Sequence, residues 1–267
     1  MAAYTGKTIV LTGASQGIGR ALALALAEQR PRLVLAARDR AALDTVADEC
    51  RAKGAEVLVV PTDVGDETQC RSLVEQAVAR FKVLDVLVNN AGISMIARFD
   101  ALADLSVYER LMKVNYLGCV YPTYHALPHL QASRGQIVVM ASLAGLTGVP
   151  TRTGYAASKH AVIGFFDSLR IELRGSGISV TVVCPYFVRS EIHRRSMGTD
   201  GNSLGTTPMQ EDRIMTAEEC AARTVAAMEK RQRMLVMTAR GKVGRFVKLV
   251  APGLVDRIAE RAVKQGR

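Results

Sequence analysis

The stretch Thr8-Ile-Val-Leu-Thr-Gly-Ala-Ser-Gln-Gly-Ile-Gly19 places a short apolar segment directly before a glycine-rich turn. An Ala- and Leu-rich helix pattern follows, near residues 18–29. Glycines permit a tight turn and let the backbone approach a pyrophosphate, while a helix start supplies free amides and partial positive charge. The strand before the turn and the helix after it predict a dinucleotide-binding site. A packing turn that needs only small residues is the alternative interpretation.

The rest of the chain continues this alternation of short apolar segments and longer helix patterns. Strands are predicted at Thr8–Leu11, Arg32–Ala36, Glu56–Pro61, Val83–Val88, Gly135–Ala141, Ser179–Val183 and Arg233–Met237, and helices near 18–29, 40–53, 67–81, 105–130, 153–174 and 216–230. Several strands are apolar throughout, as in a parallel sheet covered on both faces. The pattern predicts an α/β Rossmann fold, with a doubly wound sheet of about seven parallel strands and helices on both faces.

Composition points to a globular protein that works in a reducing compartment. The chain has 267 residues, of which 49% are hydrophobic and 22% charged, and no apolar run reaches the ~18 residues of a membrane span. The N-terminus lacks the basic start and apolar stretch of a signal peptide. Five widely spread cysteines without a Cys-x-x-Cys pair argue against disulfides and zinc, so we expect a cytoplasmic protein.

No metal site is predicted from the histidines. His125, His129 and His193 lack further ligands at metal spacing. His125 and His129 are one helical turn apart, but Pro128 between them argues against a regular helix face.

No repeat, low-complexity stretch or linker divides the chain, so residues 1–267 are predicted to form a single dinucleotide-binding and catalytic domain. Within it, residues 191–215 carry two Gly-containing stretches and few apolar anchors. A loop of that length inside a compact domain is usually functional or disordered. Because it follows the sixth strand, we expect it to be a substrate lid.

The C-terminal part holds nearly all of the net charge of +10. Residues 230–267 contain eleven Lys/Arg against two acids. Residues 240–267 form a basic amphipathic extension with an apolar stripe made of Val243, Phe246, Val247, Val250, Leu254, Ile258 and Ala262. One interpretation is peripheral contact with an anionic membrane surface, and the other is packing on the domain or in a dimer. The absence of an aromatic platform disfavours nucleic-acid binding.

The end of the second strand bears on the form of the cofactor. It reads Ala36-Ala37-Arg38-Asp39, and Ala37 stands where a carboxylate would bind the 2′-hydroxyl of NAD(H). Arg38 suits the 2′-phosphate of NADP(H), because a guanidinium can pair with phosphate and stack on adenine. NADP(H) is therefore preferred, and a one-residue shift that brings Asp39 to the tip leaves NAD(H) open.

Tyr155 and Lys159 lie four residues apart in Gly-Tyr-Ala-Ala-Ser-Lys-His (154–160). On a helix this spacing puts the phenol and the ammonium on one face, one turn apart. A nearby cation favours phenolate, so the pKa of the Tyr155 phenol is expected to fall from its usual ~10 toward the range of a general acid/base. An ordinary pair on a solvated helix face is the alternative.

Together these pieces resemble the short-chain dehydrogenase/reductase family across nearly the whole chain. The matching residues, in family order, are Thr12-Gly13-x-x-x-Gly17-x-Gly19, Asp63-Val64, Asn89-Asn90-Ala91-Gly92, Asn115, Ser142, Tyr155-x-x-x-Lys159 and Pro185. Residues 155–170 and Leu249–Leu254 look most like members related to 11β-hydroxysteroid dehydrogenase.

The resemblance implies a catalytic set of Asn115, Ser142, Tyr155 and Lys159. Tyr155 would give and take the proton, and Lys159 would lower its pKa and bind the nicotinamide ribose. Ser142 would hydrogen-bond the substrate oxygen, and Asn115 would hold a water that links Lys159 to solvent. The cofactor-binding residues, including those argued above, are Gly13, Ser15, Gln16, Gly17, Ile18, Gly19, Arg38, Asp63, Val64, Asn89, Ala91, Gly92, Tyr155, Lys159, Pro185, Val188 and Ser190.

The family pattern breaks after the sixth strand, where Tyr186 replaces a glycine beside the nicotinamide. Glycine adopts a positive φ without cost, so the replacement leaves the backbone conformation at Tyr186 undetermined. The larger side chain is expected to narrow the pocket. Ser190 keeps a hydroxyl that could meet the carboxamide.

The function implied is NADP(H)-dependent interconversion of a ketone and a secondary alcohol by hydride transfer. Candidates for the cleft and lid favour a lipophilic small-molecule substrate; they are Ile93, Met95, Ile96, Phe99, Leu143, Leu146, Tyr186, Phe187, Ile192 and Met197. Arg189, Arg194 and Arg195 leave open an anionic carrier, so a 3-oxoacyl-thioester reductase is the enzymatic alternative. A non-catalytic dinucleotide-sensing protein is the other alternative, although it would not need the four catalytic residues. The resemblance also implies a homodimer or homotetramer.

Overall fold

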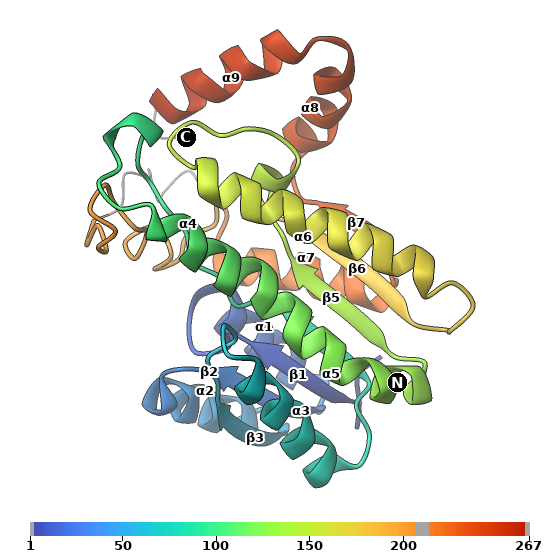
Figure 1. Cartoon of the computed structure of the whole chain (residues 1–267). Helices are drawn as coiled ribbons and strands as arrows, with labels where there is room; N and C mark the ends of the chain where they lie inside the picture. The colour runs from blue at the N-terminus through green and yellow to red at the C-terminus, as the bar shows by residue number, and fades with distance from the viewer. Residues whose placement is uncertain (1–2, 207–213, 265–267) are drawn as a thin grey trace.

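One sheet of parallel strands runs through the computed structural model, which describes residues 3–206 and 214–264. Its strands are β1 (Thr8–Thr12), β2 (Arg32–Ala37), β3 (Glu56–Pro61), β4 (Val86–Asn89), β5 (Gln136–Met140), β6 (Ser179–Cys184) and β7 (Met234–Val236). Across the described residues the seven strands lie in the order β3-β2-β1-β4-β5-β6-β7 (Figure 1). The strand order reverses between β1 and β4, which is where open α/β sheets bind ligands. The predicted fold class is confirmed.

Helices cover both faces of the sheet, and each layer has its own apolar core. On one face pack α1 (Gly17–Ala27), α2 (Arg40–Ala52) and α7 (Ala217–Glu229), with Leu26 and Cys220 among the fully buried residues. On the other face pack α3 (Glu67–Phe81), α5 (Gly118–Ser133) and α6 (Thr153–Glu172), with Phe166 among the fully buried residues. All five residues of β1 are buried because the strand is covered on both sides.

The single helix predicted at 105–130 is divided in the structure. It consists of α4 (Ser106–Leu111), the π-helical turn η2 (Met112–Leu117) and α5. Pro128 lies inside α5, so the argument that it interrupts the helix between His125 and His129 was wrong. A proline removes the hydrogen bond to the carbonyl four residues earlier, here that of Tyr124.

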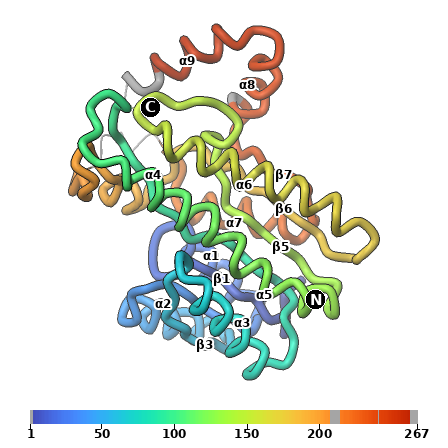
Figure 2. The backbone as a smooth tube through the Cα atoms, in the orientation of Figure 1, coloured from blue at the N-terminus to red at the C-terminus, as the bar shows by residue number. Residues whose placement is uncertain are grey.

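The C-terminal extension folds into two further helices, α8 (Ala239–Val250) and α9 (Pro252–Lys264). Figure 2 shows both beyond the ends of β5–β7, beside the loop that leads into α6. Short 3₁₀ turns, η1 (Phe99–Ala101) and η3 (Leu143–Gly145), lie in the loops after β4 and β5. The extension therefore lies at the carboxyl end of the sheet.

The glycine-rich turn packs closely against the end of β4. Gly13 has a φ of +65°, and a Cβ there would lie 2.8 Å from the Ala91 Cα. A Cβ on Gly19 would lie 2.0 Å from the Gly13 carbonyl oxygen. The Asn90 Nδ2 donates to the carbonyl oxygens of Thr12 and Gly13, at 2.9 and 3.1 Å. These contacts fix the turn over the crevice between β1 and β4.

Two helical glycines give a matched test of this packing. Gly19→Ala should lower the free energy of unfolding by about 1–3 kcal/mol or more, because its methyl group meets the Gly13 carbonyl, which is backbone and cannot move aside. Gly164→Ala in α6 should raise it by up to about 1 kcal/mol, because a Cβ there meets no atom within 4 Å and alanine favours the helix. Denaturant unfolding measures both values. Equal effects at the two positions would contradict the close packing.

Candidate active site

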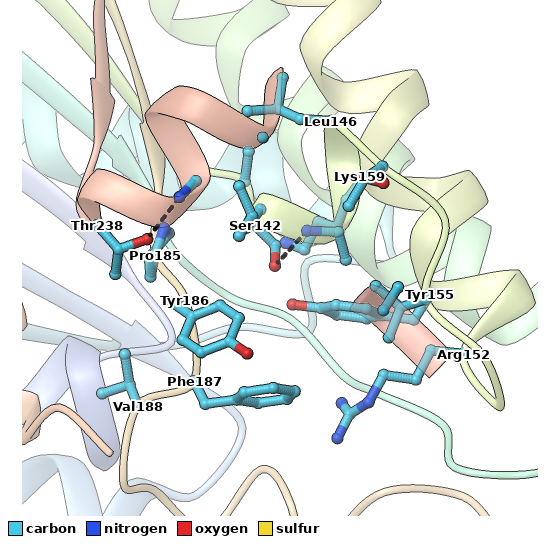
Figure 3. A pocket seen from close by; sticks show the side chains of 18 of the residues that line it. Ser142, Leu146, Arg152, Tyr155, Lys159, Pro185, Tyr186, Phe187, Val188 and Thr238 are labelled. Atoms are coloured by element: carbon cyan, nitrogen blue, oxygen red, sulfur yellow. Dashed lines mark hydrogen bonds between the residues drawn. The ribbon is translucent and has the colours of Figure 1, made fainter. Parts of the chain in front are cut away.

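A cavity of about 1070 Å³ opens at the carboxyl ends of β5 and β6. The loops after these strands, the start of α6 and the extension α8–α9 surround it. Figure 3 shows several of its side chains. The lining includes Ile18, Asn90, Gly92, Ser142, Leu146, Arg152, Tyr155, Lys159, Pro185, Tyr186, Phe187, Val188, Ser190, His193, Val247, Leu254 and Ile258. Much of the predicted catalytic set therefore meets in one place.

Tyr155 and Lys159 both face this cavity from the first turns of α6. The Tyr155 hydroxyl points into the cavity (Figure 3) and makes no hydrogen bond with the described residues. Lys159 is only 4% exposed, and its Nζ donates to the Met140 carbonyl at 2.8 Å. The Nζ lies 5.8 Å from the centroid of the Tyr155 ring. The ammonium is thus placed to stabilise negative charge on the phenol oxygen.

Asn115 lies in the π-helical turn η2 and is fully buried. Its Oδ1 accepts from the Ile93 amide at 2.8 Å, and its Nδ2 donates to the Ile93 carbonyl and the Ser158 Oγ at 3.0 and 2.9 Å. The side chain thereby joins the loop after β4 to α6. Gly92 in that loop lies close to Lys159, since a Cβ there would be 3.6 Å from the Nζ. π-Helical turns often occur at functional sites. The water-holding role of Asn115 stays a prediction.

Ser142 follows β5 in an extended conformation and begins η3. Its Oγ accepts from the Ala144 amide at 3.1 Å, so it caps this turn as well as lining the cavity. A hydroxyl that accepts one hydrogen bond still has its own hydrogen to donate. Ser142 can therefore donate to a substrate oxygen in the cavity.

The glycine-rich turn leaves room for a pyrophosphate. The N-cap residue of α1, Gln16, makes no side-chain capping hydrogen bond, so the first amides of the helix remain available to phosphate oxygens. A Cβ on Gly17 would lie 3.1 Å from the Ser190 Cβ, which places the loop after β6 against the turn that also contains Ser15. The Ala91 amide donates to the Thr12 Oγ1 at 3.1 Å. These residues fit a dinucleotide at the switch point of the sheet.

Farther along this edge, β2 and β3 end side by side, with Ala37 opposite Pro61. Arg38 follows β2, is exposed, and has no hydrogen-bond or ion-pair partner among the described residues. Asp39 caps α2, and its carboxylate accepts from the Ala42 amide at 3.0 Å. Beyond β3, the Asp63 Oδ1 accepts from the Gly65 amide at 2.9 Å, and Val64 beside it is buried.

Asn89, at the end of β4, is buried. Its Nδ2 donates to the Thr123 Oγ1 at 2.9 Å, while its Oδ1 has no hydrogen-bond partner. The side chain thus ties the end of β4 to α5, next to the cleft.

Tyr186 does not have a positive φ, so its backbone needs no glycine. Its ring packs edge-on against Phe187, with centroids 4.7 Å apart. Both rings line the cavity and narrow it, as Figure 3 shows.

Half of the apolar residues predicted for the cleft line it, namely Leu143, Leu146, Tyr186, Phe187 and Ile192. The others, Ile93, Met95, Ile96, Phe99 and Met197, do not. Met95 and Met197 are instead buried together in a small core with Leu111, because their segments pair through the Ile96 amide and the Met197 carbonyl, 2.9 Å apart. The sequence does not reveal this pairing.

The predicted lid, 191–215, is described in part, since residues 207–213 lie outside the described residues. Ile192 and His193 of this segment line the cavity. Arg189, Arg194 and Arg195 are exposed and do not line it. The three arginines that suggested an anionic carrier therefore lie outside the cavity.

Sequence reasoning missed two contributors to the site. The first is the extension: α8 and α9 wall the cavity, and the Lys248 Nζ anchors α8 by donating to the Leu146 carbonyl at 3.0 Å. The amphipathic stripe could have indicated this contribution, because packing of the extension on the domain was one of the two interpretations of the stripe.

The second is Arg152, which no motif marks. It is 5% exposed, and its Nη1 donates to the Ser94 Oγ at 3.1 Å. Its Cζ lies 5.3 Å from the centroid of the Phe187 ring. Burial lowers the pKa of the Arg152 guanidinium.

His193 lies near Arg152. Burial and the charge of Arg152 lower the pKa of His193 to about 4, so the ring is neutral. Its Nε2 donates to the Val188 carbonyl at 3.1 Å.

Comparison with known proteins gives a consistent result. A family profile described as short chain dehydrogenase matches residues 7–200. The "Dehydrogenase/reductase SDR family protein 7-like" of Dictyostelium discoideum is 34% identical over 259 residues, covering 95% of this chain and 80% of the relative. The "11-beta-hydroxysteroid dehydrogenase A" of Sesamum indicum is 37% identical over 257 residues, covering 94% and 74%.

Two solved structures are also similar. A short chain dehydrogenase/reductase from Burkholderia phymatum in complex with NAD has a TM-score of 0.83 at 27% identity, covering 95% of this chain and 96% of the other. An alcohol dehydrogenase from Thermococcus sibiricus complexed with 5-hydroxy-NADP has a TM-score of 0.76 at 25% identity, covering 86% and 94%.

Proposed function

Because the chain belongs to the short-chain dehydrogenase/reductase family of oxidoreductases, we propose that it interconverts a lipophilic ketone and a secondary alcohol with NADP(H). The observation that carries the proposal is the meeting of Ser142, Tyr155 and Lys159 at one cavity. Asn115 positions the loop after β4 beside them.

The chain's own residues hold the substrate oxygen and move its proton. Ser142 donates a hydrogen bond to the carbonyl oxygen, and Tyr155 gives that oxygen its proton as the alcohol forms. Lys159 stabilises the negative charge left on the phenol oxygen. When bound, the nicotinamide dinucleotide supplies or accepts the hydride. In the oxidising direction the same residues work in reverse.

The preference for NADP(H) is supported by the end of β2. Asp39 is the N-cap residue of α2, and its Oδ1 accepts from the Ala42 amide, which directs the carboxylate toward the start of that helix. Arg38 is exposed beside it and has no protein partner among the described residues. An uncommitted guanidinium at this position suits a 2′-phosphate.

A lipophilic substrate is supported by the size and the walls of the cavity. Its volume, about 1070 Å³, lies at the upper end of ordinary small-molecule sites. Leu146, Phe187, Val247 and Ile258 contribute apolar surface from four different segments. Several relatives carry the name 11-beta-hydroxysteroid dehydrogenase. The described part of the predicted lid, residues 191–206, would cover this substrate through Ile192 and His193.

The extension also presents an apolar face outward, and we infer that it contacts an anionic membrane surface. Phe246 and Leu249 are 69% and 80% exposed, Val250 is exposed beside them, and none of the three lines the cavity. The surrounding segment is strongly basic. Apolar insertion and attraction to anionic lipid both favour binding at the interface. Among the described residues, none of the helices is long and apolar enough to span a bilayer.

A cytoplasmic location and a homo-oligomer are parts of the same proposal. The five cysteines, all described, are free and buried, which suits a reducing compartment. Tyr124 on α5 and Ile171 on α6 are exposed on the helices that would form a subunit contact.

Tyr155→Phe tests the proton transfer. Turnover of ketones should fall by about 10²-fold or more, because the hydroxyl that gives the proton is removed. The dissociation constant of NADPH, measured by calorimetric titration, should stay within twofold. Tyr108→Phe is the matched control, since its hydroxyl bonds to Thr153 and does not line the cavity. Retained turnover in Tyr155→Phe would refute the assigned role.

Arg38→Ala tests the preference for the cofactor. The kcat/KM for NADPH should fall roughly ten- to a hundredfold, the effect of losing one hydrogen bond to a charged group. The kcat/KM for NADH should hardly change. Arg40→Ala is the control, because Arg40 is paired with Asp44 on the surface. An unmodified enzyme that prefers NADH would overturn this part of the proposal.

Vesicle sedimentation tests membrane contact. The full chain should sediment with vesicles that contain anionic lipid and much less with neutral ones. Replacing Phe246 and Leu249 together by Ser should remove most of this binding. Val83→Ser, at an exposed apolar position just before the start of β4, should leave it unchanged. Equal partitioning of all variants would dispose of the membrane proposal.

A further inference from the structure

Arg152 is a buried cation without a counter-ion in the wall of the cavity. Only 5% of its surface is exposed, and none of the described Asp or Glu residues forms an ion pair with it. Its Nη1 donates to the Ser94 Oγ, but its Nη2 has no hydrogen-bond partner. Buried charges are ordinarily paired, because an unpaired one loses its hydration without compensation. A ligand that brings negative charge would supply what is missing.

The backbone before Arg152 is strained in a way that helps to hold the residue there. Thr151 has a φ of +64°, a conformation that β-branched residues rarely adopt. Its carbonyl accepts from the Ala97 amide at 2.9 Å, which fixes the turn. Arg152 is then the N-cap residue of α6, three positions before Tyr155. Strain of this kind collects at ligand-binding sites.

The neighbourhood of Arg152 contains a second unsatisfied polar atom. His193 lines the same cavity, its ring centroid is 6.0 Å from that of Phe187, and its Nδ1 is buried without a partner. Because its Nε2 donates to Val188, the neutral ring presents Nδ1 as an acceptor. A water or a hydroxyl beside a bound anion would satisfy it. Two buried polar atoms without hydrogen-bond partners, the Arg152 Nη2 and the His193 Nδ1, thus lie near Phe187 in the wall of the cavity.

We propose that Arg152 forms a carboxylate subsite, and that the substrate is an amphiphilic oxo acid or hydroxy acid with a lipophilic body. This inference rests on the proposed carbonyl–alcohol function. The carboxylate pairs with the Arg152 guanidinium while the reacting oxygen meets Tyr155 and Ser142. Figure 3 shows the Arg152 side chain running beneath Tyr155 toward Phe187. The half-buried Phe187 ring covers the guanidinium, so the ring turns aside when the acid binds.

Turnover of matched substrates tests the subsite. The substrates are oxo fatty acids with the oxo group at successive chain positions, each compared with its neutral methyl ester. The unmodified enzyme should prefer at least one acid over its ester. Arg152→Met should lower kcat/KM for that acid by about 30-fold or more, the usual loss when one partner of a buried charge pair is truncated. The kcat/KM for the ester and the dissociation constant of NADPH should stay within threefold.

Binding of decanoate and decanol tests the subsite without turnover. The unmodified protein should bind decanoate at least tenfold more tightly than decanol, by calorimetric titration. Arg152→Met should abolish this preference, and Phe187→Ala should keep or strengthen it because the guanidinium is uncovered. Arg98→Met removes one positive charge outside the cavity and should leave the preference for decanoate over decanol unchanged.

The outcomes separate this inference from the proposed function. The subsite is refuted if the unmodified protein prefers neither decanoate over decanol nor any oxo acid over its ester. That result refutes it whether or not neutral ketones are reduced, and it does not require Arg152→Met to fold. If decanoate is preferred through Arg152 while no carbonyl compound is reduced, the subsite stands and the proposed function fails. A loss of acid and ester turnover in equal measure would make Arg152 a structural residue and overturn the inference.

Discussion

The buried ammonium of Lys159 is the interaction on which the site depends. Its hydrogen bond to the Met140 carbonyl fixes the start of α6 against the end of β5. With that helix fixed, Tyr155 one turn earlier faces the cavity, and Ser142 just beyond β5 faces it too. A buried ammonium is tolerated only where polar groups surround it, and besides the Met140 carbonyl the backbone of Gly92 lies near the Nζ, since a Cβ on Gly92 would be 3.6 Å away.

The parallel sheet brings residues from distant parts of the chain to this ammonium. The carboxyl ends of β1, β4, β5 and β6 are neighbours, so the loops that follow them share one edge. Close packing at Gly13 and Gly19 holds the first loop against the second, and Asn90 bonds across them. The loops after β1 and β4 carry glycines, Gly13 and Gly92, where the backbone lies against neighbouring residues. Rigid strands thus position groups that local structure alone could not bring together.

The difference between local patterns and long-range contacts explains what could be predicted from the sequence. The strands were predicted because uninterrupted Val, Ile and Leu runs report burial on both faces, and Tyr155 with Lys159 because their spacing is local to one helix. The pairing of the Met95 and Met197 segments, the passage of Pro128 through α5 and the position of α8–α9 depend on long-range contacts. Arg152 was not predicted because its burial results from contacts with distant parts of the chain, which no local motif reports. Arg194 and Arg195 were considered because they are basic residues near the cleft in sequence, but they lie outside the cavity.

The electrostatics of the cavity follow from the same arrangement. Lys159 and Arg152 approach it from one helix, both are buried, and neither is paired with a carboxylate among the described residues. Burial and, after it, the charge of Arg152 lower the pKa of His193 to about 4. A cavity with apolar walls and fixed cations concentrates negative ligands. Anions that bind there relieve uncompensated charge in the folded state alone, so they stabilise the fold as they bind. Binding affinity and stability are therefore coupled through the same two side chains.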